Sequence, residues 1–131
     1  MLYLSGDLGA GKTTLARGLL RACGIAGPIR SPTYTLVQVY ESGPQTLLHL
    51  DLYRLKDAAE LEHLGLGEWA KPGSLWLIEW PQRGAKLLPP ADLTVTLAAG
   101  PHGHEAQLAA STAAGAAWLA RMGRNARELK A

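Results

Sequence analysis

The spacing of apolar residues predicts strands that alternate with helices. The run Leu2-Tyr3-Leu4 is short and apolar, as a buried strand requires. Residues 14–23 follow it with leucines at helical spacing, and Gly24 is placed to end that helix. Residues 75–78 form another continuous apolar run, which is typical of a buried parallel strand.

Alternating patterns predict further strands. Residues 35–40 alternate and are rich in β-forming side chains, and 46–51 form a second strand that could pair with them as a hairpin. Residues 92–98 and 104–109 alternate on either side of a glycine-rich turn. We expect these two segments to form an antiparallel hairpin at a sheet edge.

Two helix starts are indicated by capping residues. Residues 57–60 resemble a capping box that opens a short helix. Ser111 is expected to cap a final helix that contains Trp118, Leu119 and Met122.

These elements predict one α/β domain over residues 1–131, since this length suits one domain and not comfortably two. The expected architecture is a mainly parallel central sheet with helices on both faces. Antiparallel strands are expected to be added from 35–51 and 92–109.

Composition and charge exclude several classes of protein. The net charge of +2 is too small to imply nucleic-acid binding by itself. Cys23 is the only cysteine, so no internal disulfide can form, which suits the cytoplasm. No apolar run approaches the length of a membrane span, and no targeting segment is visible. We therefore expect a cytoplasmic protein without membrane contact.

The first loop carries the clearest chemical signal. Residues 6–13 fit G-x-x-x-x-G-K-[ST], between the first strand and the first helix. Glycines let the backbone approach a polyphosphate closely, and the helix N-terminus favours an anion. Lys12 supplies a positive charge for the β- and γ-phosphates, and the Thr13 hydroxyl can ligate Mg²⁺. The expected phosphate-binding residues are Gly6, Asp7, Leu8, Gly9, Ala10, Gly11, Lys12, Thr13 and Thr14.

Two carboxylates are candidates for the metal and for catalysis. Asp51 and Glu79 each follow an apolar run, and ligands of such sheets collect at the carboxyl ends of parallel strands. Either acid could hold Mg²⁺ or its waters, or polarise the attacking water. His49, by contrast, is interpreted as an ordinary strand residue.

Four stretches together resemble one protein family. They are the loop at 5–14 and the segments 31–37, 49–55 and 78–81, in this order. The set is similar to the TsaE family (formerly YjeE), the ATPase component of the bacterial tRNA threonylcarbamoyladenosine machinery. The resemblance covers roughly residues 2–97 and is specific, whereas the loop alone would suit many families.

The resemblance implies a P-loop ATPase that binds ATP with Mg²⁺ and is weakly active alone. It implies action with the TsaD and TsaB proteins, which transfer a threonylcarbamoyl group to adenosine 37 of tRNAs reading ANN codons. This chain would meet tRNA indirectly, through that complex. Hydrolysis would reset the complex between turnovers.

The resemblance also implies roles for matching residues. Lys12, Asp51 and Glu79 would be catalytic, and Thr13, Asp51 and Glu79 would surround the metal. Thr33 to Thr35 would form a switch-like segment near the γ-phosphate.

Other functional residues are expected around the same site. Trp80 would lie beside the nucleotide or a partner protein. No arginine finger is assigned, and Arg54, Arg30 or a partner's arginine could serve.

The chain departs from the family at its N-terminus. Family members usually carry an extra N-terminal segment that helps to shape the base pocket, whereas only Met1 to Ser5 precede the loop here. The domain is therefore expected to be truncated relative to the family. Either the chain starts late, or it binds the base differently.

Three other functions remain open. A small-molecule P-loop kinase would need an acceptor pocket and usually an arginine-rich lid, and Arg83 is alone in the region after Glu79. A GTPase usually carries an Asn-Lys-x-Asp motif, which is absent. A non-catalytic ATP-dependent binding module would bind nucleotide and partner without turnover.

Overall fold

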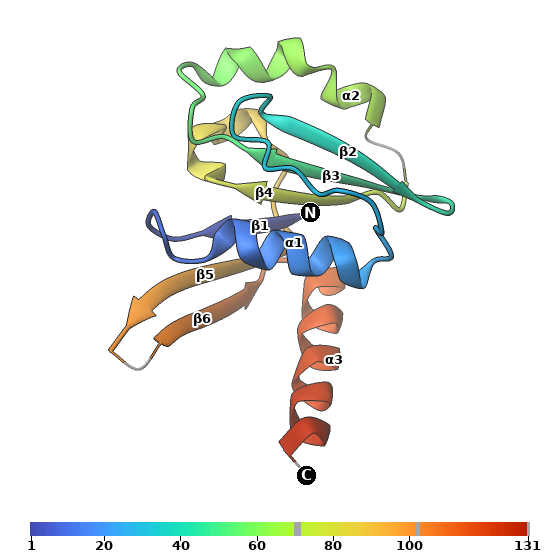
Figure 1. The fold of residues 1–131 in the computed structure, drawn as a ribbon, viewed down its shortest axis with the longest axis vertical. Helices are drawn as coiled ribbons and strands as arrows, with labels where there is room; N and C mark the ends of the chain where they lie inside the picture. Colours follow the sequence, from blue (N-terminus) through green and yellow to red (C-terminus); the bar gives the residue numbers. More distant parts are fainter. Residues whose placement is uncertain (70–71, 102, 131) are drawn as a thin grey trace.

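The computed structural model describes residues 1–69, 72–101 and 103–130, and in this part of the chain six strands form one sheet. The strands are β1 (Leu2–Ser5), β2 (Val37–Ser42), β3 (Gln45–Asp51), β4 (Leu75–Glu79), β5 (Leu93–Gly100) and β6 (Gly103–Ala110). They are ordered β2-β3-β4-β1-β5-β6 (Figure 1). The four inner strands are parallel, whereas β2 and β6 run antiparallel at the two edges. The predicted mainly parallel sheet is therefore confirmed.

The two predicted hairpins fit the sheet differently. The β5–β6 hairpin lies at an edge, as expected. The β2–β3 hairpin also forms, but β3 is parallel to β4, so the prediction that all of 35–51 is an antiparallel addition is wrong. β2 begins at Val37 rather than Thr35, because Leu36 has a φ of 68° and its N–H donates to the Pro32 carbonyl at 2.8 Å. This turn keeps the preceding residues out of the strand.

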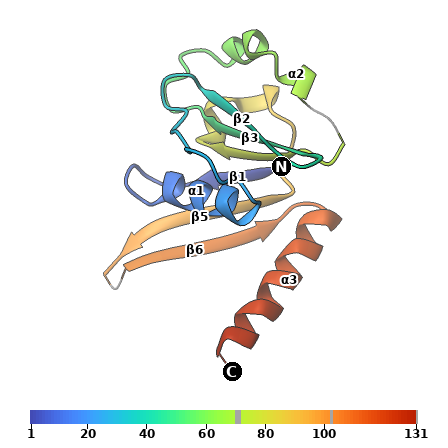
Figure 2. The same ribbon diagram turned by 45° about the vertical axis from the view of Figure 1, so that its right-hand side comes forward.

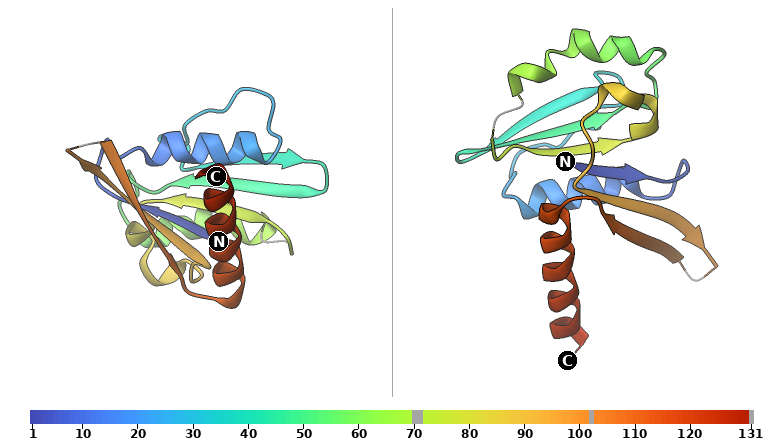
Figure 3. Two further views of the ribbon diagram at one scale, coloured as in Figure 1. Left: turned by 90° about the horizontal axis from the view of Figure 1, so that it is seen from below. Right: turned by 180° about the vertical axis from the view of Figure 1, so that it is seen from behind.

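Helical segments cover both faces of the sheet. They are α1 (Lys12–Ala22), η1 (Ala58–Leu64), α2 (Leu66–Trp69), η2 (Pro81–Arg83), η3 (Ala85–Leu87) and α3 (Ala113–Lys130), where η denotes a 3₁₀ helix. Seen from below, α1 lies on one side of the sheet and the gold 3₁₀ turns after β4 lie on the other (Figure 3, left). The prediction of helices on both faces is confirmed.

The core consists of two apolar layers, one on each face of the sheet. Along β4, Leu77 packs into the layer under α1, whereas Trp76 and Ile78 pack into the layer under the 3₁₀ segments. Leu77 and Ile78 are fully buried. The continuous apolar run in β4 follows from this burial on both faces, because successive strand residues point to opposite sides.

The 57–60 capping box forms as predicted. The Asp57 carboxylate accepts the Ala59 N–H at 3.0 Å, and the Glu60 carboxylate accepts the Asp57 N–H at 3.2 Å. The box opens the 3₁₀ helix η1, which turns Leu61 into the core.

The last helix, α3, is capped by Thr112 rather than by Ser111, which corrects the prediction. The Thr112 hydroxyl accepts the Gly115 N–H at 3.1 Å and donates to the Asp92 carboxylate at 2.7 Å. Trp118, with its neighbours Leu119 and Met122, packs against the core layer under α1. The rest of α3 extends away from the sheet (Figure 2). Among the described residues, no helix is both long and apolar enough to cross a membrane.

Candidate functional site

The glycine-rich loop connects β1 to α1, which begins at Lys12 rather than at residue 14. Three of its glycines have positive φ angles: 140° at Gly6, 78° at Gly9 and 101° at Gly11. A side chain at Gly6 would also place its Cβ 2.4 Å from the Leu97 carbonyl oxygen. The backbone of this loop therefore requires glycine, and it leads directly into the N-terminus of an eleven-residue helix.

Lys12 lies in this loop with only 5% of its surface exposed. Its Nζ donates to the carbonyl oxygens of Gly6 and Asp7, the latter at 3.0 Å, and lies 4.0 Å from the centre of the Trp80 ring. Burial lowers the pKa of the Lys12 ammonium, while the charges of Glu79, Asp51 and Asp7 raise it. The cation is thus held inside the loop by main-chain oxygens and an aromatic face.

The two candidate acids lie side by side at the carboxyl ends of β3 and β4. The register of these parallel strands pairs Asp51 with Glu79. Glu79 is almost fully buried, and its Oε1 accepts a hydrogen bond from the Thr13 hydroxyl at 2.8 Å. This bond joins the end of β4 to the loop, as predicted for residues that share one site.

Asp51 is also buried, and its Oδ1 accepts the Tyr53 N–H at 3.0 Å. Burial is the largest influence on its carboxyl group and raises its pKa. The Tyr53 N–H lowers this pKa, the charge of Glu79 raises it, and His49 and Lys12 lower it. The balance is a carboxyl group that holds its proton more tightly than an exposed aspartate does.

Aromatic side chains line one side of the site. Trp80 follows β4 with a φ of 57°, and its ring centre lies 5.0 Å from that of Tyr53. Arg54 stacks its guanidinium 4.5 Å from the centre of the Tyr34 ring, which is 81% exposed.

These groups surround one cavity of about 410 Å³. Its lining residues are Leu8, Gly9, Ala10, Gly11, Lys12, Thr13, Thr14, Thr33, Asp51, Tyr53, Arg54, Glu79 and Trp80. Most of the predicted site residues are therefore brought together, along with Tyr53, which sequence reasoning did not single out.

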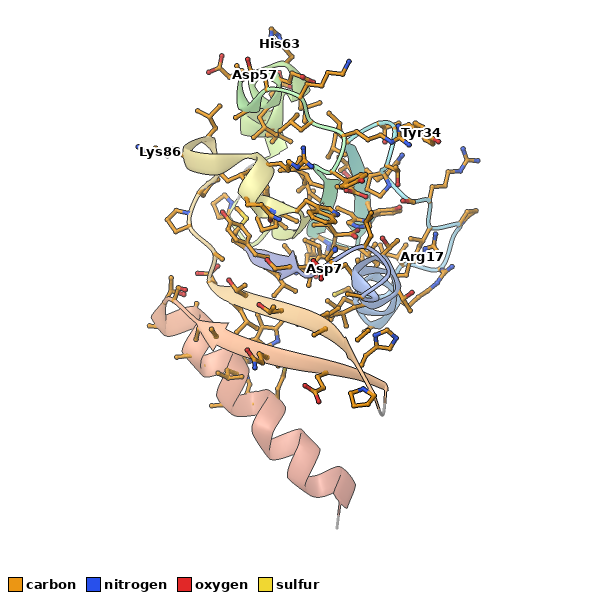
Figure 4. The ribbon with its side chains drawn as sticks, turned by 90° about the vertical axis from the view of Figure 1, so that its left-hand side faces the viewer. Asp7, Arg17, Tyr34, Asp57, His63 and Lys86 are labelled. Atoms are coloured by element: carbon orange, nitrogen blue, oxygen red, sulfur yellow. The ribbon has the colours of Figure 1, made fainter. Side chains whose placement is uncertain are left out.

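Three predicted residues lie outside the cavity lining. Gly6 and Asp7 contribute carbonyl oxygens to Lys12 instead. In the view of Figure 4, Asp7 lies near the middle of the molecule, whereas Asp57, which caps η1, and His63, within η1, lie far from it. Thr35 is exposed, and its hydroxyl accepts a hydrogen bond from the Gln38 side chain at 3.2 Å. Its switch-like role stays a prediction.

His49 lies on β3, as the sequence interpretation expected, but its contact with Glu79 was not anticipated. It is fully buried, and its Nε2 lies 2.6 Å from Glu79 Oε2. Strand periodicity could have indicated this contact. His49 and Asp51 are two residues apart and share a face of β3, and the register pairs Asp51 with Glu79.

The cavity contains oxygen donors suited to Mg²⁺, namely the Thr13 hydroxyl and the carboxylates of Asp51 and Glu79. Mg²⁺ usually keeps several waters and takes phosphate oxygens, so it needs few protein ligands. Among the described residues, no three His, Cys, Asp or Glu side chains group as an all-protein metal site. The donor set therefore fits a metal that is shared with a phosphate.

Comparisons with known proteins point to one family. A family model described as "Threonylcarbamoyl adenosine biosynthesis protein TsaE" matches residues 1–107. A protein named tRNA threonylcarbamoyladenosine biosynthesis protein TsaE from Haemophilus influenzae is 50% identical over 97 residues, covering 74% of this chain and 61% of that protein. A Bacillus subtilis protein of the same name is 39% identical over 97 residues, covering 74% and 60%. The match thus spans less than two thirds of the length of these relatives.

A solved structure resembles the whole fold. The crystal structure of Bacillus subtilis YdiB matches with a TM-score of 0.76 at 29% identity. The match covers 95% of this chain and 76% of that one.

Proposed function

Because the chain belongs to the TsaE family, we propose that it binds Mg²⁺ and ATP, hydrolyses the ATP and serves the formation of threonylcarbamoyladenosine in tRNA. The names of its relatives point to the pathway, and its own residues support the nucleotide chemistry. The observation that carries the proposal is the 2.8 Å hydrogen bond between the Thr13 hydroxyl and Glu79. This bond joins an acid to the glycine-rich loop, and nucleotide hydrolysis would need an acid beside the bound phosphates.

The loop supports binding of a polyphosphate. Its backbone N–H groups and the N-terminus of α1 would accept the negative charge. Lys12 already lies among them, where its Nζ is bound by two carbonyl oxygens that a phosphate could replace.

Bound Mg²⁺ would neutralise charge on the β- and γ-phosphates. Thr13 and Glu79 are the better placed residues to hold it. The Thr13 hydroxyl donates a hydrogen bond to Glu79, which leaves the lone pairs of the Thr13 oxygen free for a metal.

We assign Asp51 to the orientation of water. It lies directly opposite Glu79 in the register and lines the same cavity. Burial raises its pKa, and a more basic carboxylate accepts a stronger hydrogen bond from an attacking water.

Partner proteins would complete the site. We propose action with the TsaD and TsaB proteins. Arg54 and the exposed Tyr34 form a stacked pair, and Arg54 and Thr33 line the cavity. A partner that docked on this pair could turn the Arg54 guanidinium toward the phosphates, or could supply an arginine of its own.

The test measures ATP hydrolysis by this chain alone and with the TsaD–TsaB heterodimer, at fixed Mg²⁺. Low activity alone and stimulation by the heterodimer, both lost in Lys12→Ala, support the proposal. Phosphate transfer to a small metabolite would instead favour a kinase. Nucleotide binding without turnover, even in the complex, would leave only an ATP-dependent binding module.

A further inference from the structure

His49 is a buried polar residue in an apolar strand. It lies on β3 between Leu48 and Leu50, and all three side chains are fully buried. Its Nε2 lies 2.6 Å from Glu79 Oε2, whereas its Nδ1 has no hydrogen-bond partner among the described residues. Burying a polar ring with one nitrogen unpaired costs free energy. The hydrogen bond between Nε2 and Glu79 offsets part of this cost.

The chemistry of the two groups fixes the direction of this hydrogen bond. An ionised carboxylate only accepts hydrogen bonds, so the proton between the two atoms belongs to Nε2. The neutral ring then leaves Nδ1 without a proton, and a bare nitrogen costs less to bury unpaired than an N–H that lacks an acceptor. The surroundings of His49 therefore favour the tautomer that donates to Glu79.

The carboxylate of Glu79 is consequently held at both oxygens. Oε1 accepts from the Thr13 hydroxyl, and Oε2 accepts from His49. The Asp51 carboxylate ends the neighbouring strand directly opposite, and its like charge favours rotation of Glu79 away from it. Within the part of the chain that the structure describes, His49 is the hydrogen-bond donor to Oε2, and it opposes such a rotation.

We propose that His49 is a positioning residue, whose Nε2–H fixes the Glu79 carboxylate so that Oε1 faces Thr13 and the metal. The proposal rests on the Mg²⁺–ATP function proposed above. His49 does not line the cavity and acts through Glu79. Residues in this position behind a metal ligand commonly change metal affinity or activity by about 10- to 100-fold when they are lost.

The first measurement needs neither nucleotide nor activity. ¹⁵N NMR of the histidine rings in the nucleotide-free protein reports which ring nitrogen carries the proton, and the signal that disappears in His49→Gln identifies this residue. We expect a proton on Nε2 of His49 and a changed ring signal in Glu79→Gln. A bare Nε2 would overturn the proposal.

The second measurement separates positioning from packing. His49→Leu fills a similar volume without a donor, whereas His49→Gln keeps a side-chain N–H. We expect His49→Leu to raise the Mg²⁺ concentration for half-maximal ATP hydrolysis by about 10- to 100-fold. ATP affinity without Mg²⁺ should stay within about twofold, and His49→Gln should retain most of the wild-type response to Mg²⁺.

A double variant tests whether His49 acts through Glu79. In a Glu79→Gln background, His49→Leu should add little to the loss, since the group that it positions is already changed. If His49→Leu and His49→Gln shift the Mg²⁺ dependence of ATP hydrolysis equally, His49 is a packing residue. A fall in thermal stability without a shift in Mg²⁺ dependence would show the same. If wild-type protein shows no Mg²⁺–ATP binding, the proposed function fails, while the NMR result still decides the hydrogen bond itself.

Discussion

At the scale of single residues, Lys12 is a buried cation that main-chain oxygens and an aromatic ring hold in the loop. Burial lowers its pKa, so the ammonium group gains by meeting a phosphate. We predict that Lys12→Ala lowers ATP turnover by about 10²-fold or more, as loss of one preorganised donor does elsewhere. The far-ultraviolet circular dichroism spectrum should not change.

Lys86→Ala is the matched control for that prediction. Lys86 is exposed on the η3 segment and lies away from the loop (Figure 4). The Lys86→Ala variant should hydrolyse ATP at the wild-type rate. Equal turnover in both lysine variants would remove Lys12 from the mechanism.

The buried carboxyl group of Asp51 serves the proposed function but lowers the stability of the folded protein. Burial raises its pKa above that of the unfolded chain, so its ionised form disfavours folding at neutral pH. Asp51→Asn should therefore raise the midpoint of thermal unfolding at pH 7 without Mg²⁺. That gain should shrink as the pH falls toward about 4, where the unfolded aspartate also takes up a proton. Melting curves across this pH range measure the gain in unfolding midpoint. A gain that grows as the pH falls would contradict the predicted direction.

At the scale of elements, α3 packs closely against Asp92, the residue before β5, at Gly115 near its first turn. A Cβ at this buried glycine would lie 1.8 Å from the Asp92 carbonyl oxygen. We predict that Gly115→Ala displaces α3 and lowers the free energy of unfolding by about 1–3 kcal/mol, as overpacking usually does. Chemical denaturation measures this change.

The same substitution at Gly18 is the control, because it should act in the opposite direction. Gly18 is an exposed interior residue of α1, and a Cβ there would meet no atom within 4 Å. Alanine favours helix by about 0.5–1 kcal/mol over glycine, so Gly18→Ala should stabilise the protein. Destabilisation of similar size at both positions would show that α3 does not depend on this contact.

The elements that the sequence predicted well are those with local signals. The loop at 6–13 and the run at 75–78 each carry a pattern that needs no knowledge of distant residues. The direction of β3 was mispredicted because it depends on pairing with β4. That strand begins at Leu75, 24 residues after β3 ends at Asp51. The contact between His49 and Glu79 was missed for the same reason, since it becomes visible only through that pairing.

At the scale of the whole molecule, the two ends of the sheet hold different features. The cavity with Lys12 and Trp80 lies where β3 and β4 end. A second cavity, of about 740 Å³, is lined by Trp118 of α3, by Leu75 at the start of β4 and by Met1. Seen from behind, α3 leaves the sheet well away from the loop that follows β1 (Figure 3, right). Trp80 and Trp118, two of the four tryptophans of the chain, therefore lie at opposite ends of the sheet.

This separation gives a prediction about tryptophan fluorescence. Lys12 Nζ lies 4.0 Å from the centre of the Trp80 ring, so any nucleotide that draws Lys12 toward its phosphates changes the charge beside that indole. We predict that Mg²⁺–ATP changes the emission of the protein and that Trp80→Phe removes most of this change. Trp118→Phe, at the far end, should lower total emission but keep the response. A response lost in Trp118→Phe and kept in Trp80→Phe would place the nucleotide, or the motion that it causes, at the base of α3.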